Sequence, residues 1–169
     1  MNKTLFTAIA IFFIAKMSAQ DKIFTHSGDT LMVSIKEIGH NNIKFIYPAE
    51  QITNTISKNV ISSIEFENGR KQIISDKIII NGKKDWEKVI VTNLESDIEG
   101  LTKVGSFKAK AKGTTFTSQG RVESRAMDKL KKESAEKGCH ILLILTTTGK
   151  SGSPYSSASS SLTAIGYKY

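Results

Sequence analysis

The sequence predicts an α+β protein in which a small all-β domain, an SH3-like barrel, precedes a ββαββ domain with one helix packed on an antiparallel sheet. Residues 21–80 contain five or six short runs that alternate apolar and polar residues between turn signals, as small barrels do. Residues 88–169 contain one stretch of helical periodicity flanked by two pairs of strand-like runs. We therefore expect a signal peptide at residues 1–20, the barrel at 21–80, a linker at 81–87 and the α+β domain at 88–169.

The first twenty residues have the order of a secretory signal peptide. Lys3 precedes an apolar or small run from Leu5 to Ala15, and small residues follow at Ser18 and Ala19. The run is shorter than the roughly 20 apolar residues of a spanning helix, and no later run is longer, so we expect cleavage and no transmembrane segment afterwards. We expect an exported protein, periplasmic or secreted. The single cysteine, Cys139, is far from the cleavage site, so we do not expect a lipoprotein.

In the first domain, the strands are indicated by period-two patterns and by turn residues. Leu31, Val33 and Ile35 alternate with polar neighbours, and Asn68-Gly69 is a strong hairpin signal between two such runs. The strands that we expect here are 23–25, 31–35, 43–47, 53–57, 60–66 and 70–74.

The second domain has one stretch with the pattern of an amphipathic helix. Residues 121–137 place Val122, Ala126 and Leu130 on one side, and Gly138 follows where a helix end favours a positive φ. Trp86, just before the domain, is expected to anchor its start by packing. The strands that we expect are 88–92, 101–112, 141–147 and 162–169, with an acidic loop at 93–100 and a mobile Ser- and Gly-rich loop at 148–161.

Several segments of the second half resemble a known family. They are Ile98-Glu99-Gly100-Leu101, Val104-Gly105, Ala126 to Leu130-Lys131, Ala135 to Leu142, and Leu162 to Tyr167. Together they resemble the YbjQ-like family, which carries a heavy-metal-binding label, and more distantly the RcsF-like envelope proteins. The resemblance covers residues 88–169 and implies the ββαββ fold and a ring-forming oligomer. Cys139 stands where that family has Ala, and the cysteines of the RcsF-like proteins are absent. The chain as a whole looks like uncharacterised exported bacterial proteins.

Positive charge is concentrated in the second half. The chain has a formal net charge of +8, residues 21–82 are balanced, and residues 83–169 hold fifteen basic against nine acidic residues. Lys108, Lys110 and Lys112 alternate with apolar residues, which predicts a basic contact face for an anionic envelope polymer. A solvated surface that aids solubility is the alternative. No aromatic residue is interleaved on the lysine side of that strand, so we do not expect nucleic acid as a partner.

Candidate ligands and nucleophiles do not form a catalytic pattern. Cys139 and His140 could bind a soft metal, but adjacent residues on a strand point to opposite faces, and Cys139 is more typical of a small buried side chain. His140 is then expected to be exposed. The pattern of Glu95, Asp97 and Glu99 is typical of a solvated acidic loop. The serines of residues 151–161 lack a nearby base, which a catalytic serine needs. We expect no catalytic residue and no cofactor.

The sequence therefore predicts a non-enzymatic exported protein that binds another protein or an anionic envelope polymer. Metal binding through Cys139 and His140 is the alternative, and hydrolase activity is the third hypothesis. Ile165, Tyr167 and Tyr169 place large side chains on the terminal strand, where a sheet edge needs protection. They are the candidate interface of a homo-oligomer.

Overall fold

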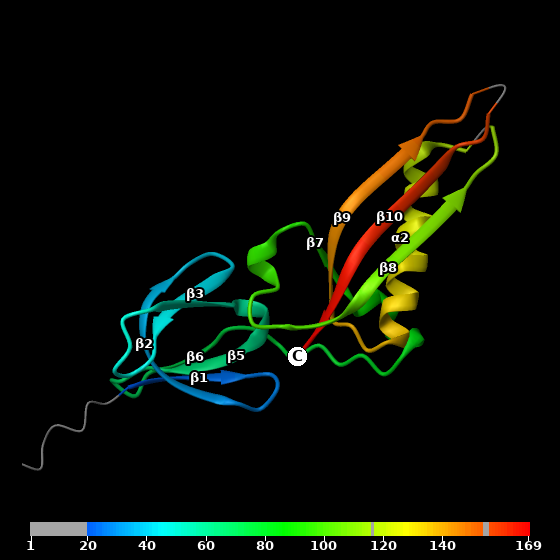
Figure 1. Ribbon diagram of the computed structural model, residues 1–169. Helices are drawn as coiled ribbons and strands as arrows, with labels where there is room; N and C mark the ends of the chain where they lie inside the picture. The colour runs from blue at the N-terminus through cyan, green and yellow to red at the C-terminus, as the bar shows by residue number, and fades with distance from the viewer. Residues whose placement is uncertain (1–19, 116, 154–155) are drawn as a thin grey trace, which may run out of the picture.

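A computed structural model describes residues 20–115, 117–153 and 156–169. It has two sheets, one formed by the first half of the chain and one by the second, with a single long helix on the second sheet. Figure 1 shows the sheets at opposite ends of an elongated molecule, joined by short segments near its middle. The α+β class is confirmed.

The first sheet has six antiparallel strands in the order β4-β3-β2-β1-β5-β6. Their bounds are β1 Asp21–Thr25, β2 Thr30–Ile38, β3 Asn42–Ile46, β4 Thr53–Ser57, β5 Ile61–Glu65 and β6 Lys71–Ile73, with a 3-10 turn at Lys58–Val60. In the described part of the chain β4 and β6 are edge strands that do not pair with each other, so the expected closed barrel is not found. The reason lies in β6, which has three residues before the chain leaves for the second sheet.

One face of the first sheet forms its own hydrophobic core. Ile23, Val33 and Ile43 are fully buried on β1, β2 and β3, and Ile61 and Ile64 are fully buried on β5. The β5–β6 hairpin turns at Asn68-Gly69, where Gly69 has a φ of +80°, as the turn signal predicts.

The second sheet has the order β7-β9-β10-β8. Its elements are β7 Ile90–Thr92, β8 Thr102–Lys112, α2 Gln119–Glu136, β9 Ile141–Lys150 and β10 Ser159–Lys168, with 3-10 turns at Lys83–Lys88 (η2) and Glu95–Asp97 (η3). The expected ββαββ order is confirmed, but β7 is parallel to β9, so the sheet is mixed and not purely antiparallel. The direction follows from the path of the chain, since α2 returns to the end of the sheet at which β7 also begins (Figure 1).

Helix α2 covers one face of this sheet. Val122, Ala126 and Leu130 are fully buried against Ala109 and Leu162 of the strands, and Trp86 packs on the same core. Gly138 has a φ of +72° and ends the helix as predicted.

The β9–β10 hairpin is longer than the sequence suggests. We expected a mobile loop at 148–161, but residues 148–150 and 159–161 are paired in the two strands. Pro154 lies outside the described residues. No helix in the described part of the chain combines the length and apolar character needed to cross a membrane.

Candidate functional site

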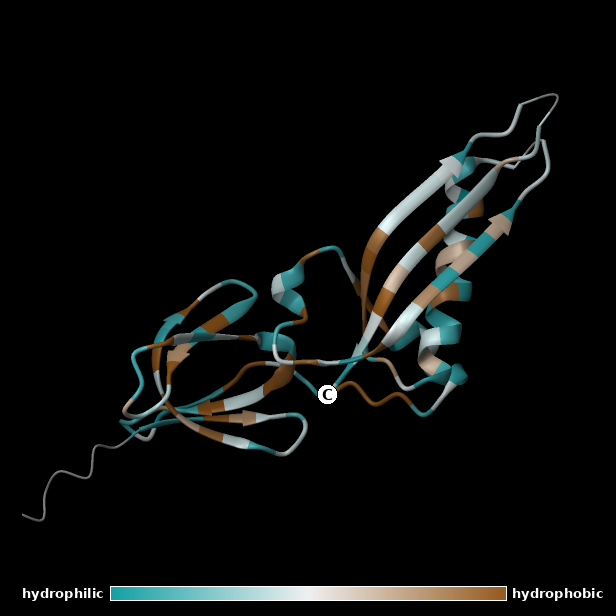
Figure 2. Cartoon of the chain, viewed as in Figure 1, coloured by the Kyte–Doolittle hydropathy of each residue, from teal (hydrophilic) through white to brown (hydrophobic). Residues whose placement is uncertain are grey.

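The second sheet has a face that no helix covers. Along β10, Ser160, Leu162 and Ala164 are buried toward α2, so Ser161 and Thr163 point to the opposite side. Figure 2 shows the long strands of the second sheet as mostly pale or teal toward their free end, whereas most of their apolar residues lie nearer the first sheet.

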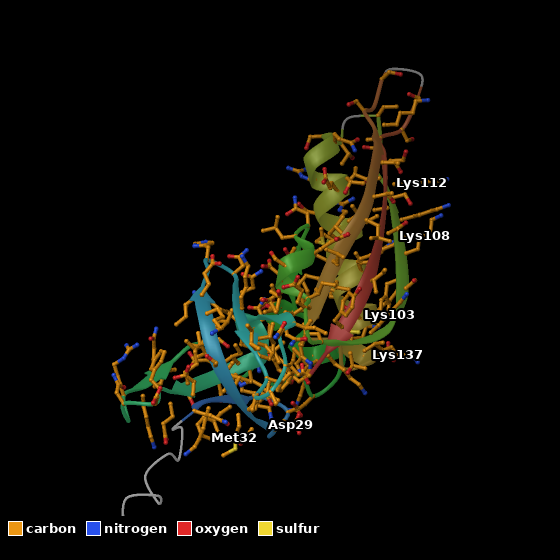
Figure 3. All side chains as sticks on the ribbon, turned by 60° about the vertical axis from the view of Figure 1, so that its left-hand side comes forward. Asp29, Met32, Lys103, Lys108, Lys112 and Lys137 are labelled. Atoms are coloured by element: carbon orange, nitrogen blue, oxygen red, sulfur yellow. The ribbon has the colours of Figure 1, made fainter. Side chains whose placement is uncertain are left out.

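Strand register brings lysines and hydroxyl groups together on this open face. Three cross-strand rows run from β8 through β10 to β9. The rows are Lys108–Thr163–Thr146, Lys110–Ser161–Thr148 and Lys112–Ser159–Lys150, and together they are called the lysine face below. Because alternate residues of a strand are about 7 Å apart, the positive charges of β8 repeat at that spacing. Figure 3 shows Lys108 and Lys112 on β8 toward the free end of the sheet.

Two of these rows border a shallow cavity of about 380 Å³. Its walls are the side chains of Lys110, Lys112 and Lys150 with neighbouring hydroxyl groups. In the row between them, Ala111 and Ser160 point to the helix side of the sheet and Gly149 has no side chain, so backbone forms the floor here. Ammonium groups and hydroxyls around such a floor can donate hydrogen bonds to an anion.

The charge of the lysine face is not neutralised by an ion pair with any residue that the structure describes. Its four lysines are exposed, and the ion pairs found among the described residues all involve other lysines. No acidic residue belongs to the three rows. The face therefore presents four positive charges to solvent.

The sequence foresaw only part of this face. Lys108, Lys110 and Lys112 lie on it as expected, whereas Lys150, Ser159 and Ser161 were assigned to a mobile loop. The sequence signal for β10 is that the apolar residues Ala158, Leu162 and Ala164 all fall at even positions, although Ser160 interrupts the pattern.

Cys139 and His140 lie in different surroundings. Cys139 is fully buried on the helix side of the sheet, and burial raises the pKa of its thiol to about 11. A thiol that stays protonated at neutral pH binds metal poorly, because the form of cysteine that ligates a metal is the thiolate. His140 is partly buried rather than exposed, and its ring lies 4.3 Å from that of Tyr169. Among the described residues no group of three potential metal ligands occurs, and metal binding stays a prediction.

The other candidate residues lie at the junction of the sheets or near it. Tyr169 contacts His140 and His26 within the chain, which leaves Ile165 and Tyr167 on the open face as candidates for an oligomer interface. The backbone carbonyl of Asp97 accepts hydrogen bonds from Ser57 Oγ at 3.0 Å and Asn59 Nδ2 at 3.1 Å. The acidic loop thus joins the second half of the chain to the first sheet.

No family model, curated protein or solved structure matches this chain. The resemblance to the YbjQ-like family and to the RcsF-like proteins accordingly stays a prediction.

Proposed function

We propose that this chain is a binding protein whose lysine face binds an anionic polymer of the cell envelope. The observation that supports the proposal is the set of three registered rows, which carry four unpaired lysines and five hydroxyl groups on a face that α2 leaves open. Such a face suits a chain of phosphate or carboxylate groups, because repeated charges on one partner meet repeated charges on the other.

The geometry favours an extended ligand over a compact one. The lysines of β8 span about 13 Å along the strand, and Lys150 lies two strands away from Lys112, at about 10 Å. The floor between the rows is open rather than enclosed, so a polymer can lie across it. The open floor favours a polymer as the ligand over a protein partner, which the sequence predicted as an alternative.

Export is part of the same proposal. An anionic envelope polymer meets the lysine face only outside the cytoplasm, and residues 1–19, whose pattern suggests a signal peptide, lie outside the described residues. The YbjQ-like grouping is a proposal too, supported by the ββαββ order of the second half.

A binding titration with defined polyanions tests the proposal. Inorganic polyphosphate and polygalacturonate supply phosphate and carboxylate charges, and single-stranded DNA supplies phosphates with bases. We expect binding of at least one of the first two, with an affinity that falls as salt rises because counterions are released. Preference for DNA over both at equal charge would contradict the proposal.

A charge-matched pair of variants locates the site. The triple substitution Lys108→Ser, Lys110→Ser and Lys112→Ser is expected to weaken binding at least tenfold and to flatten its salt dependence. The control removes three exposed lysines elsewhere, through Lys36→Ser, Lys83→Ser and Lys84→Ser. Equal loss in both variants would mean that net charge alone acts. No loss in either would mean that the β8 lysines serve only to protect a sheet edge.

A further inference from the structure

Two histidines from different halves of the chain lie against one tyrosine ring. The His26 ring, in the turn between β1 and β2, is 5.0 Å from that of Tyr169, and the His140 ring, just before β9, is 4.3 Å from it. His26 directly follows β1 of the first sheet, whereas His140 directly precedes β9 and Tyr169 directly follows β10 of the second. These three rings, called the ring stack below, form a contact between the sheets.

The hydrogen bonds of His26 place a proton on its Nε2, and burial of the ring disfavours a second one. Its Nε2 lies 2.9 Å from Ser75 Oγ, and that hydroxyl lies 3.0 Å and 2.8 Å from the carbonyls of Lys58 and Ile61. Since Ser75 has one proton and donates it to a carbonyl, it accepts the hydrogen bond from His26 Nε2–H. His26 is 5% exposed, so a second proton on its ring would be a buried charge.

His140 is even less suited to a second proton. Its Nδ1 is buried and has no hydrogen-bond partner among the described residues. In the neutral ring with its proton on Nε2, Nδ1 carries an unpaired lone pair. In the doubly protonated ring, Nδ1 would carry an N–H for which the described residues offer no acceptor. Lys77 and Lys168 act on His140 with positive charge, and His26 adds to this only when it is itself protonated.

We propose that the ring stack is an acid-sensitive latch, closed while both histidines are neutral and opened when they are protonated. The rings bridge the two halves of the chain, the buried Nδ1 of His140 has no acceptor for an added proton among the described residues, and the charges nearest the two histidines are mostly positive. The backbone of Asp97 and Glu99, which bonds to Ser57, forms a second connection that does not depend on the histidines and serves as the hinge.

The direction of the pH effect follows from the surroundings. Burial is the largest cause that lowers the pKa of His26 and of His140; Lys77 lowers both pKa values further, and Asp76 partly opposes this for His26. In the open latch each ring returns toward its ordinary pKa of about 6.5 and binds protons more readily. The latch is therefore fully closed above about pH 6.5 and weakens as pH falls toward the lowered pKa values of the closed form.

The distance between the halves of the full chain, measured by fluorescence transfer, tests the latch. Dyes are attached at Ser34→Cys on β2 and Ser124→Cys on α2, both exposed, while the fully buried Cys139 stays unlabelled. We expect one distance above pH 7 and a second, altered population that grows as pH falls from 6.5 to 5. For each proton taken up, the equilibrium shifts by up to about tenfold per pH unit.

Variants separate the latch from general acid effects. His140→Phe keeps a flat ring that cannot take a proton, and we expect it to lower the pH dependence by about one proton. His40→Asn alters the third histidine, which is exposed, and should behave as the parent does. Tyr169→Ala removes the shared ring and should give the altered distance already at pH 7.5.

Three results would overturn the proposal. The first is an unchanged distance between pH 7.5 and pH 5, with the far-ultraviolet circular dichroism of the folded chain retained. The second is equal pH dependence in His140→Phe and His40→Asn. The third is loss of the whole fold at pH 5 in the parent and in His140→Phe alike, because acid would then act on the entire molecule.

Discussion

Gly166 shows how the space available to a single residue shapes the core of the second sheet. It lies near the C-terminal end of β10, paired with Gly105 on β8 and Leu142 on β9. A Cβ atom built at Gly166 would lie 2.5 Å from Cys139 Sγ and 2.6 Å from Phe107 Cε2. The position is therefore restricted by its neighbours. Cys139 accordingly acts as a small core side chain beside Gly166, which accounts for its full burial.

Gly166→Ala is expected to destabilise the chain. The added methyl group overlaps a sulfur atom and an aromatic ring in a packed core, and such overpacking costs about 1–3 kcal/mol. The measurement is the free energy of unfolding from urea denaturation.

Gly105→Ala is the matched control for this prediction. Gly105 faces Gly166 across the ladder, and a Cβ built there has nothing within 4 Å. We expect a change within about 0.5 kcal/mol. If the two variants lost the same stability, crowding at Cys139 and Phe107 would not be the cause.

At the scale of elements, local patterns predicted most boundaries. Strand β4 was expected at 53–57 and is found there, and the helix expected at 121–137 spans Gln119–Glu136. Alternation, turn residues and helical spacing are properties of neighbouring residues, so they can be read from sequence. Barrel closure and the direction of β7 depend on partners far along the chain, and the expectations of a closed barrel and of a purely antiparallel second sheet were wrong.

The β9–β10 hairpin shows why half of the candidate site was missed. Residues 159–161 are all serine, so their polarity does not alternate, although Ser160 points into the core and its neighbours do not. The pairing with β8, which aligns Ser159 and Ser161 with lysines, is non-local. The Ser-rich composition therefore indicated a loop, whereas strand pairing places Ser159 and Ser161 on the lysine face.

The stability of helix α2 on the sheet depends on its buried side. Leu130 is fully buried between the helix and the strands, so Leu130→Ala removes apolar contacts and leaves a cavity. We expect a loss of about 2–5 kcal/mol in the free energy of unfolding, measured by urea denaturation. Ser124→Ala, at an exposed position of the same helix, should change the stability by less than about 0.5 kcal/mol. A comparable loss in both variants would indicate that helix propensity, rather than burial, sets the stability.

At the scale of the whole molecule, the sequence gives no sign of how the two halves meet. His26, His140 and Tyr169 are far apart in the chain, and only the folded arrangement brings their rings together. Each core also contacts a residue from the other side of the expected linker at 81–87. Ile80, which precedes the linker, packs on the second core, and Leu101, which follows it, packs on the first.

The packing of Ile80 on the second core predicts where a stable fragment of the second half must begin. A fragment of residues 76–169 keeps Ile80 on its core, whereas a fragment of residues 83–169 exposes the apolar surface that Ile80 covers. Full burial of an Ile side chain contributes about 1.5–3 kcal/mol, and Ile80 is partly buried, so we expect a smaller but measurable difference. Thermal unfolding of both fragments should show a cooperative transition at a lower temperature for 83–169.

Two substitutions in the longer fragment identify the cause. Ile80→Ala should reduce its melting temperature toward that of 83–169, while Ile79→Ala, at a side chain that is 57% exposed, should leave it nearly unchanged. Equal melting temperatures for the two fragments would instead support a boundary at 81–87 with no shared packing. Because Ile80 packs on one core and Leu101 on the other, we expect each isolated half to be less stable than the same half within the full chain.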